Sequence, residues 1–354
     1  CIRDRRNSIV DSDAGFSAQI WADLAELGII GALFNDDRGG FGGAGFDIAT
    51  VFEELGRAGV VEPFLETAVL AGGLIADLGT EDQRGLIEDV IAGSTQLAFA
   101  HTEPGSRYDL SRIGTTAQVT GNQIGLTGQK AVVQNAEAAD MIVVTARETG
   151  DVADPAGLSL FLVSRDTPGL TLLGYPMMDG GRAAELTFED VMLTDTDRLG
   201  PPGAAFEAIE RRVATANVAL CAEALGAMET ATRLTISYLG QRTQFGRPIG
   251  SFQVLQHRVA DMLIELEQAR SMVILAAGHL NDDRSSRERH VSAAKSLIGR
   301  VGRQIAEESI QMHGGIAMTQ EYELAHIAKR IIMIDHRLGD TDHHMERFIA
   351  LGAE

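Results

Sequence analysis

Acidic and imidazole side chains cluster near the end of the chain, in the segment RLGDTDHHMERF at residues 337–348. Carboxylates and imidazoles are common general bases, so Asp340 is the local candidate for a proton-abstracting residue, with Asp342 and His343 nearby. Together with His344, the same side chains could also suggest a metal site. The structural alternative is that Asp340 or the threonine after it caps the N-terminus of a final helix.

Two other segments, RTQFGRPIG and QMHGG, hold polar and glycine residues whose meaning depends on their surroundings. Taken alone, Arg242 is typical of a surface ion-pair partner, and GRPIG of a turn between helices with Pro248 as the breaker. Gly314 and Gly315 alone would indicate the C-terminal cap of a helix.

The charge of the chain argues against several classes of partner. Its 354 residues carry a net charge of −20, which repels phosphate backbones and anionic lipid. We therefore expect neither nucleic acid nor a membrane as a partner, and we interpret the acidity as a solubility trait. The only cysteines are Cys1 and Cys221, too few for a disulfide framework or a cysteine-based zinc site.

The expected location is the cytoplasm. No apolar run approaches the ~20 residues that span a bilayer, and no signal peptide is visible. Because the chain begins at Cys1 rather than at methionine, we expect that some sequence precedes it.

The elements that must position these residues fall into three regions. WADLAELGII, DIATVFEELG and TAVLAGGLIADLG carry apolar residues at helical spacing, which predicts a helical domain at residues 1–95. The glycine-rich DDRGGFGGAGF between them lacks a preceding strand, so it is interpreted as a turn rather than a phosphate cradle. β-rich runs such as TTAQVTG, MIVVTAR and LSLFLVS predict an antiparallel β-domain at residues 96–200. After GPPGAAF, helical periodicity predicts a bundle at residues 201–354, which completes an α+β plan.

Four stretches together resemble one family. RTQFGRPIGSFQVLQHRVADM at residues 242–262 is similar to a signature of the acyl-CoA dehydrogenase family, and QMHGGIAMTQEYELAHIAKR at residues 311–330 to its C-terminal segment. AFAHTEPG and GQKAVVQNAEAAD resemble two further family stretches, in the right order. The resemblance covers nearly the whole chain and implies the family's fold, with an N-terminal helical domain, a middle β-domain and a C-terminal helical bundle.

The resemblance also implies a chemistry and an assembly. Family members use FAD to oxidise an acyl-CoA thioester to the 2,3-enoyl-CoA, in lipid metabolism and β-oxidation, while a carboxylate removes the α-proton. In the family's tetramers, one subunit's β-domain holds the flavin ring, and a neighbour's C-terminal domain holds the ADP end. This division implies that each chain contributes to two different FAD sites, the flavin-ring half of one and the ADP half of the other.

The half that a subunit lends to its neighbour matches the family pattern. Arginine suits a pyrophosphate because its planar fork donates two parallel hydrogen bonds, and glycine allows close backbone approach. The resemblance implies FAD contacts for Arg242, Gln244, Phe245, Gln253, Gln311, Gly314 and Gly315.

The half that holds the flavin ring departs from the family pattern. The family's TEPGAGSD is TEPGSRYD here, so Thr102 is kept while Arg107 and Tyr108 replace small residues, which should crowd a cofactor. The alternative is that the loop has shifted and FAD still fits. In GQKAVVQN, Val132 stands where most members have a flavin-stacking aromatic, although Gln134 could still hydrogen-bond the flavin.

The family's catalytic base is absent from both of its known positions. Its E-G-T sequence corresponds to Gly339, Asp340 and Thr341, of which Thr341 keeps the cofactor-contacting residue type. The earlier-helix position that some members use is Ala216, beside which Asn217 replaces the usual arginine. Asp340 remains a weak rescue candidate, and the family context argues against a metal site.

Three functions follow from these expectations. The first is an acyl-CoA dehydrogenase subunit that completes the FAD site of a homologous catalytic partner in an α2β2 assembly. The second is a homotetrameric dehydrogenase whose base is Asp340 or another, unrecognised residue. The third is a non-enzymatic acyl-CoA-binding protein on the same fold. An electron-transferring flavoprotein is the family's usual electron acceptor.

Overall fold

The computed structural model describes residues 2–352, so that Cys1 lies outside the described part of the chain. The chain divides into two compact units. The β-unit comprises Asn7–Ala44 and Val61–Ala216, and the helical unit comprises Cys1–Arg6, Gly45–Val60 and Asn217–Glu354. The expected domain limits at 95/96 and 200/201 do not coincide with a boundary between these two units. The three-domain limits stay predictions.

The N-terminal part of the β-unit is helical, as expected, but one helix has an unexpected form. The segment Leu65–Gly72 is a π-helix that continues into α4 (Gly73–Leu78). All eight residues of the π-helix are buried, so its apolar pattern could not distinguish this wider winding from an α-helix. The remaining α-helices are α2 (Ala18–Glu26), α5 (Glu81–Arg84) and α6 (Leu86–Ile91), together with α1 (Ile2–Val10), whose residues up to Arg6 belong to the helical unit.

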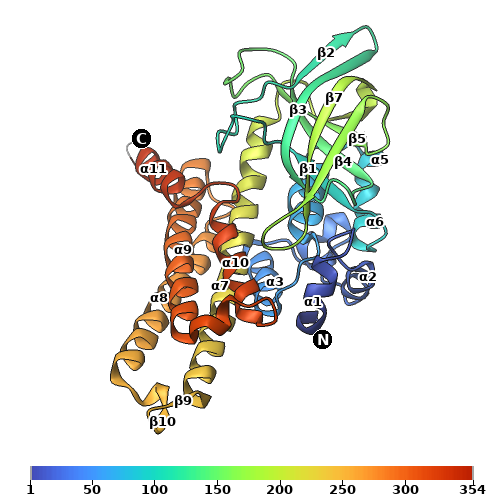
Figure 1. Ribbon diagram of the computed structural model, residues 1–354. Helices are drawn as coiled ribbons and strands as arrows, with labels where there is room; N and C mark the ends of the chain where they lie inside the picture. The colour runs from blue at the N-terminus through green and yellow to red at the C-terminus, as the bar shows by residue number, and fades with distance from the viewer. Residues whose placement is uncertain (1, 353–354) are drawn as a thin grey trace. The chain divides into compact units, whose positions relative to one another are not determined.

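An eight-stranded sheet forms the rest of the β-unit (Figure 1). The strands are β1 (Leu97–Ala100), β2 (Thr116–Thr120), β3 (Gln123–Gln134), β4 (Met141–Arg147), β5 (Leu158–Ser164), β6 (Leu170–Pro176), β7 (Arg182–Thr194) and β8 (Arg198–Leu199). They are ordered β6-β7-β3-β2-β4-β5-β8, and β1 pairs with β4. Most pairs are antiparallel as predicted, but β1 and β2 both run parallel to β4.

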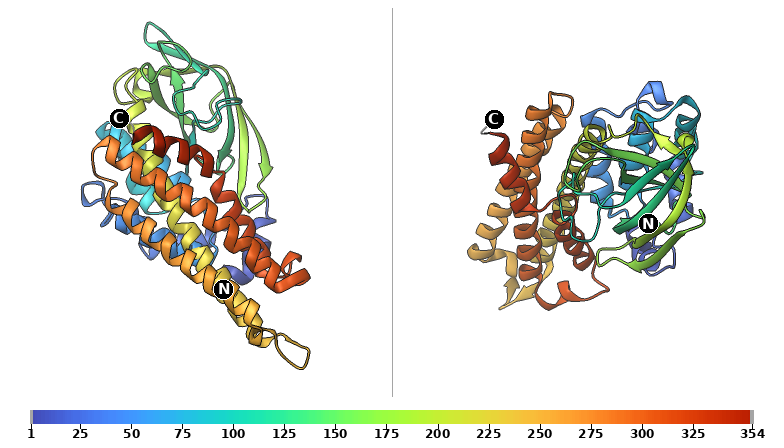
Figure 2. Two further views of the ribbon diagram at one scale, coloured as in Figure 1. Left: turned by 90° about the vertical axis from the view of Figure 1, so that its left-hand side faces the viewer. Right: turned by 90° about the horizontal axis from the view of Figure 1, so that it is seen from above.

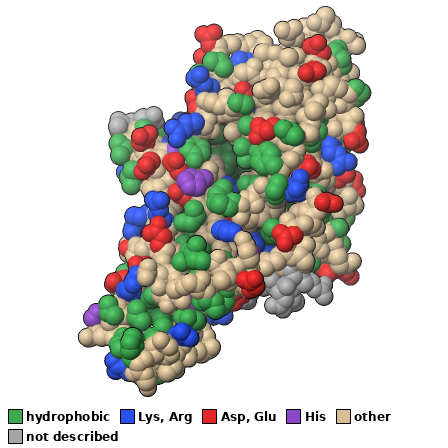
Figure 3. Space-filling view, in the orientation of Figure 1, with side chains coloured by type: hydrophobic (Ala, Val, Ile, Leu, Met, Phe, Trp, Pro, Cys, Tyr) green, Lys and Arg blue, Asp and Glu red, His purple; other side chains and the backbone are tan. Residues whose placement is uncertain are grey.

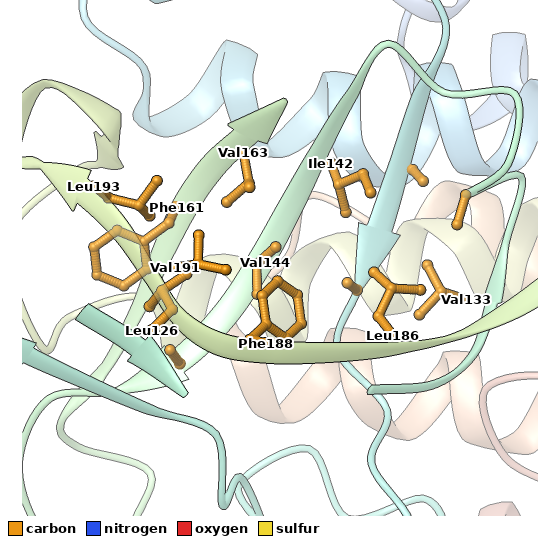
Figure 4. Close-up of a cluster of buried hydrophobic side chains, with 14 of the residues drawn as sticks. Leu126, Val133, Ile142, Val144, Phe161, Val163, Leu186, Phe188, Val191 and Leu193 are labelled. Atoms are coloured by element: carbon orange, nitrogen blue, oxygen red, sulfur yellow. The ribbon is translucent and has the colours of Figure 1, made fainter. Parts of the chain in front are cut away.

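The core of the β-unit lies between the strands (Figure 4). Phe161 of β5 and Phe188 of β7 are its largest side chains, packed with Leu126, Ile142 and Leu186. All but one residue of β4 and of β5 are buried, which explains their continuous apolar sequences, whereas β2 is largely exposed. The sheet therefore supplies a rigid platform for the loops at its ends.

The helical unit contains the C-terminal helices and also α3, which comes from the N-terminal third of the chain. Figures 1 and 2 show α9 alongside α8, α10 and α11. Among the described residues, no helix is long and apolar enough to cross a membrane. The elements are α3 (Gly45–Ala58), α7 (Phe206–Gln241, which begins in the β-unit), β9 (Thr243–Gln244), β10 (Arg247–Pro248), α8 (Gln253–Gly278), α9 (Arg284–His313), α10 (Glu323–Asp335) and α11 (Thr341–Leu351).

Two glycines explain why α3 belongs with the C-terminal helices. A Cβ at Gly56 of α3 would lie 2.7 Å from the carbonyl carbon of Glu223 in α7. A Cβ at Gly226 of α7 would lie 2.8 Å from the backbone nitrogen of Arg57 in α3. The two helices therefore touch backbone to backbone, and the Arg57 guanidinium also pairs with Glu229 of α7 at 2.8 Å.

Candidate functional site

The RTQFG segment forms a two-residue hairpin between α7 and α8. Gln244 pairs with Arg247, and Thr243 with Pro248. The turn residues Phe245 and Gly246 both have left-handed backbones, with φ of 53° and 79°, which is the geometry of a type I′ turn. Phe245 is 90% exposed at the tip.

Arg242 lies at the base of this hairpin, at the end of α7, and is exposed. Its carbonyl oxygen accepts a hydrogen bond from the backbone of Ile249. Among residues 6–352, whose side chains the structure describes, the Arg242 side chain has no ion-pair partner, so the surface ion-pair interpretation is not supported there. Gln244 and Gln253, two other expected FAD contacts, are exposed as well, and Gln253 is the first residue of α8.

The QMHGG segment ends α9. Gly314 is the C-cap of that helix, which confirms the capping interpretation, yet the glycines also leave open space. A Cβ at Gly314 or Gly315 would meet no atom within 4 Å. The ring of buried His313 stacks on Tyr238 of α7 at a centroid distance of 4.4 Å, which fixes the segment against the bundle. Gln311 is exposed on the last turn of the helix.

The TEPGSRYD loop of the β-unit is anchored by a residue that sequence patterns did not single out. Glu103 accepts hydrogen bonds from the backbone of Gly114 and Thr115 and forms an ion pair with Lys130 at 2.7 Å. Burial lowers the pKa of the Lys130 ammonium to about 8, against the opposing effect of Glu103. The carbonyl of Thr102 accepts a bond from Ala131, which ties this loop to β3.

Two side chains near the expected flavin ring have strained backbones. Arg107, where the family pattern has glycine, has a φ of 49° and is exposed. Val132, where the pattern has an aromatic, has a φ of 53° within a bulge of β3 and is 49% exposed. A left-handed conformation is particularly unfavourable for a β-branched residue, so this bulge stores strain. Gln134 lies two residues further along β3 and is half-buried.

The expected base position is closed by neighbouring side chains. Gly339 has a φ of 116°, and a Cβ built there would clash with the Nε2 of His344 and lie 2.8 Å from the Cδ2 of His343. Asp340 is the N-cap of α11 and accepts a hydrogen bond from the backbone of His343 at 2.9 Å. The capping interpretation of Asp340 is thus confirmed. The Thr341 hydroxyl donates to Asp335 at 2.9 Å.

Three side chains from different helices hold the carbonyl groups of this turn. The fully buried Lys295 of α9 donates from its Nζ to the carbonyls of Asp335 and Gly339, at 2.9 and 2.6 Å. The Nε2 of His344 lies 3.1 Å from the carbonyl of Leu338, and the Nδ2 of Asn217 lies 3.5 Å from it. A lysine within the apolar sequence AAKSLIG was the one signal in the sequence for this arrangement.

The protonation of these groups follows from their burial. Burial, together with the nearby Lys295 charge, lowers the pKa of His344 to about 2, so that its imidazole is neutral. Burial also lowers the pKa of Lys295 to about 8. Ala216, at the second expected base position, is fully buried in α7, and the adjacent Asn217 has a buried Oδ1 without a hydrogen-bond partner among the described residues.

The Asp and His side chains near residue 340 do not form a metal centre. In the part of the chain that the structure describes, no group of three or more His, Cys, Asp or Glu residues could hold a metal ion. Asp340 is engaged as a helix cap, and His344 is engaged by the turn.

Comparison with known families decides the identity of the fold. The "Acyl-CoA dehydrogenase, C-terminal domain" family matches residues 205–349, the corresponding middle domain residues 98–191, and the N-terminal domain residues 3–94. The chain belongs to the acyl-CoA dehydrogenase family. The expected fold, with N-terminal helical, middle β and C-terminal helical domains, is confirmed.

Individual acyl-CoA dehydrogenase relatives resemble the chain over most of its length. "Probable acyl-CoA dehydrogenase YngJ" of Bacillus subtilis is 30% identical, over 96% of this chain and 90% of that protein. The "Caffeyl-CoA reductase-Etf complex subunit CarC" of Acetobacterium woodii is 29% identical, over 89% and 84%. A solved variant of the "Tcur3481-Tcur3483 steroid ACAD" has a TM-score of 0.88 and 31% identity, over 99% of this chain and 92% of that chain.

FAD is the cofactor of this family, in agreement with the sequence-based expectation. The helical unit fits the nucleotide end of FAD, because Arg242 is exposed without an ion-pair partner among the described side chains, and the two glycines after His313 border open space. The flavin-ring end fits less well, because Val132 offers no aromatic face and sits in a strained bulge. The residues of this chain thus fit the nucleotide end of FAD better than they fit its flavin ring.

Proposed function

We propose that this chain is an acyl-CoA dehydrogenase subunit that lacks its own catalytic base and completes the FAD site of a homologous partner subunit. The observation that carries the proposal is the turn at Gly339. The position holds no carboxylate, and the ring of His344 fills the space that a side chain would need. The neighbouring Asp340 is already engaged as the cap of α11.

The intact nucleotide half supports a role in cofactor binding. When bound, FAD supplies the hydride acceptor for the oxidation of an acyl-CoA thioester. The residues of this chain would orient its nucleotide end, with Arg242 on the pyrophosphate and the open backbone at Gly314 and Gly315 allowing close approach. Phe245, Gln244, Gln253 and Gln311 would complete this half, while Thr102, Gln134 and Thr341 would contact FAD in the partly altered half.

The proposed partners follow from the relatives. The "Tcur3481-Tcur3483 steroid ACAD" carries two protein names, which supports an α2β2 assembly of this chain with a homologue. The name of the Acetobacterium relative includes an Etf complex, which supports an electron-transferring flavoprotein as the electron acceptor. Both inferences are by analogy. A homotetramer that uses Asp340 as its base is the alternative, and the capping hydrogen bond of Asp340 argues against it.

The substitution Arg242→Ala tests the proposal in a complex with the partner subunit. Loss of a charge-assisted phosphate contact costs about 1.5–3 kcal/mol, or roughly ten- to a hundredfold in FAD affinity. The flavin is removed from the co-purified complex and titrated back while its fluorescence is followed. The variant, made in this chain only, should weaken the partner's site.

A matched control separates this effect from the removal of any exposed charge. Arg303→Ala removes an exposed arginine whose ion pair, among the described side chains, is with Glu307 one turn further along the same helix, at 3.3 Å, and such pairs contribute little. It should leave FAD affinity unchanged. If Arg242→Ala behaves like Arg303→Ala, this chain does not complete a neighbour's flavin site.

A further inference from the structure

The hairpin lies in a basic stretch of an otherwise acidic protein. Residues 230–260 contain no Asp or Glu, although the chain has 50 acidic residues against 30 basic ones. The same stretch contains Arg233, Arg242, Arg247 and Arg258. Figure 3 shows basic and hydrophobic side chains in the part of the helical unit where Figure 1 places β9 and β10. An anion would meet a favourable local charge here despite the net charge of −20.

The register of the hairpin places two arginines on one face. Gln244 and Arg247 are directly opposite each other, so their side chains point to the same side, about 5 Å apart at Cβ. Arg242 lies two residues before Gln244, and its carbonyl pairs with the backbone of Ile249. Arg242 lies outside β9, but its pairing with Ile249 continues the register of the hairpin, and side-chain alternation along that register would place Arg242 on the face of Gln244 and Arg247. The backbone register thus puts Arg242, Gln244 and Arg247 at positions that share one side of the hairpin.

Arg247 is held in place without using its hydrogen-bond donors. Its guanidinium lies over the ring of Phe252, with 4.2 Å between its Cζ and the ring centroid. Among residues 6–352, whose side chains the structure describes, the Arg247 side chain forms no ion pair and no hydrogen bond. Two arginines of the following helices are instead held in ion pairs, Arg258 of α8 with Glu308 at 2.5 Å and Arg300 of α9 with Glu265 at 2.9 Å. Stacking restricts the guanidinium plane and leaves its edges open to an anion.

We propose that Arg247 is a second anion-binding residue, which acts with Arg242 to bind the diphosphate group of an adenine nucleotide. A diphosphate carries two adjacent groups of oxygen acceptors, and two planar guanidinium forks on one face match that pattern. The inference rests on the proposed function and deepens it, because it adds a contact to the same half-site. FAD and CoA both contain an adenosine diphosphate group, so the experiment must distinguish these two sources.

The test measures binding of FAD and of CoA separately, by isothermal titration calorimetry on the purified, flavin-depleted full chain together with any partner that co-purifies. Arg247→Ala should weaken the binding of FAD or of CoA by about tenfold or more. Arg247→Lys keeps the charge but loses the planar fork, so its affinity should lie between those of the unaltered protein and of Arg247→Ala. The affinity of the Arg247→Ala protein should also depend less on salt concentration, because one screened charge contact is gone.

The control and the other outcomes decide between the inference and the proposed function. Arg303→Ala again serves as the matched loss of an exposed charge. If Arg247→Ala lowers the affinity for FAD alone, the hairpin binds the flavin cofactor, and if it lowers the affinity for CoA alone, the hairpin binds the substrate. Either result supports an anion-binding role for Arg247. If Arg247→Ala matches Arg303→Ala for both probes while Arg242→Ala weakens FAD binding, this inference fails and the proposed function stands. If Arg242→Ala also leaves FAD affinity unchanged, both the inference about Arg247 and the proposed function fail.

Discussion

At the scale of single residues, the Gly339 turn is a stable structure in its own right rather than an active site with one side chain missing. Lys295 and His344 donate to carbonyls of the turn from two helices. The His344 imidazole also lies 3.3 Å from the hydroxyl of Ser292 through its Nδ1, so the ring is held from both sides. A side chain at residue 339 would therefore have to displace a buried, bonded group.

Gly339→Glu should give no strong dehydrogenase activity and should lower the melting temperature. The new Cβ would clash with the Nε2 of His344 in a left-handed backbone, a combination that we expect to cost roughly 2 kcal/mol or more. Gly121→Ala is the control, because its φ is 63° but a Cβ there meets no atom within 4 Å. Robust turnover from Gly339→Glu alone, measured with several acyl-CoA esters, would show that the pocket is closer to competence than the geometry indicates.

Lys295 should make the stability of the chain rise with pH just above neutrality. Its folded pKa is lowered to about 8, below the unfolded value of about 10.4, so between these values the unfolded state binds more protons. The free energy of unfolding therefore increases with pH across this window, by up to about 1.4 kcal/mol per unit from this group. Urea denaturation between pH 8 and 9 should show a smaller rise for Lys295→Met than for the unaltered protein. Equal slopes would mean that the ammonium is not buried as the structure shows.

At the scale of elements, sequence patterns located most helices and strands but did not show which elements pack against each other. β2 to β7 lie where alternating or β-rich runs predicted them. The short β1 and β8 were not predicted, because four and two residues carry too little periodicity. The assignment of α3 to the helical unit was also invisible, since it depends on the contact that Gly56 and Gly226 allow with the opposite backbone.

Gly226→Ala should destabilise the helical unit by a few kcal/mol. An added methyl group would overlap the backbone of α3, which cannot move without disturbing the ion pair between Arg57 and Glu229. Gly240→Ala in the same helix is the matched control, because a Cβ there meets no atom within 4 Å. Replacing an unhindered helical glycine with alanine should be stabilising by up to about 1 kcal/mol. Thermal melts of the two variants should therefore shift in opposite directions, and a shift in the same direction would contradict the close packing of α3 on α7.

At the scale of the whole molecule, the proposed function assigns the two units unequal contributions to cofactor binding. The residue types at Arg242, Gly314, Val132 and Gly339 could be recognised from motifs, because those motifs have a fixed spacing along the chain. The support around them could not, because the Glu103–Lys130 pair and the Lys295 contacts join residues far apart in sequence. Motifs thus predicted the candidate site residues, whose contacts with FAD stay predictions, and the structure shows the long-range contacts that surround the altered positions.

The flavin content of the chain purified alone tests the central proposal most directly. Flavin absorbance per subunit is measured first, and acyl-CoA esters are then added anaerobically to look for bleaching. Because Val132 offers no stacking surface and no carboxylate stands at Gly339, we predict FAD well below one per subunit and no bleaching. Full flavin occupancy with rapid bleaching by an acyl-CoA ester would show that the chain carries a complete active site, and the proposed role as a completing subunit would be wrong.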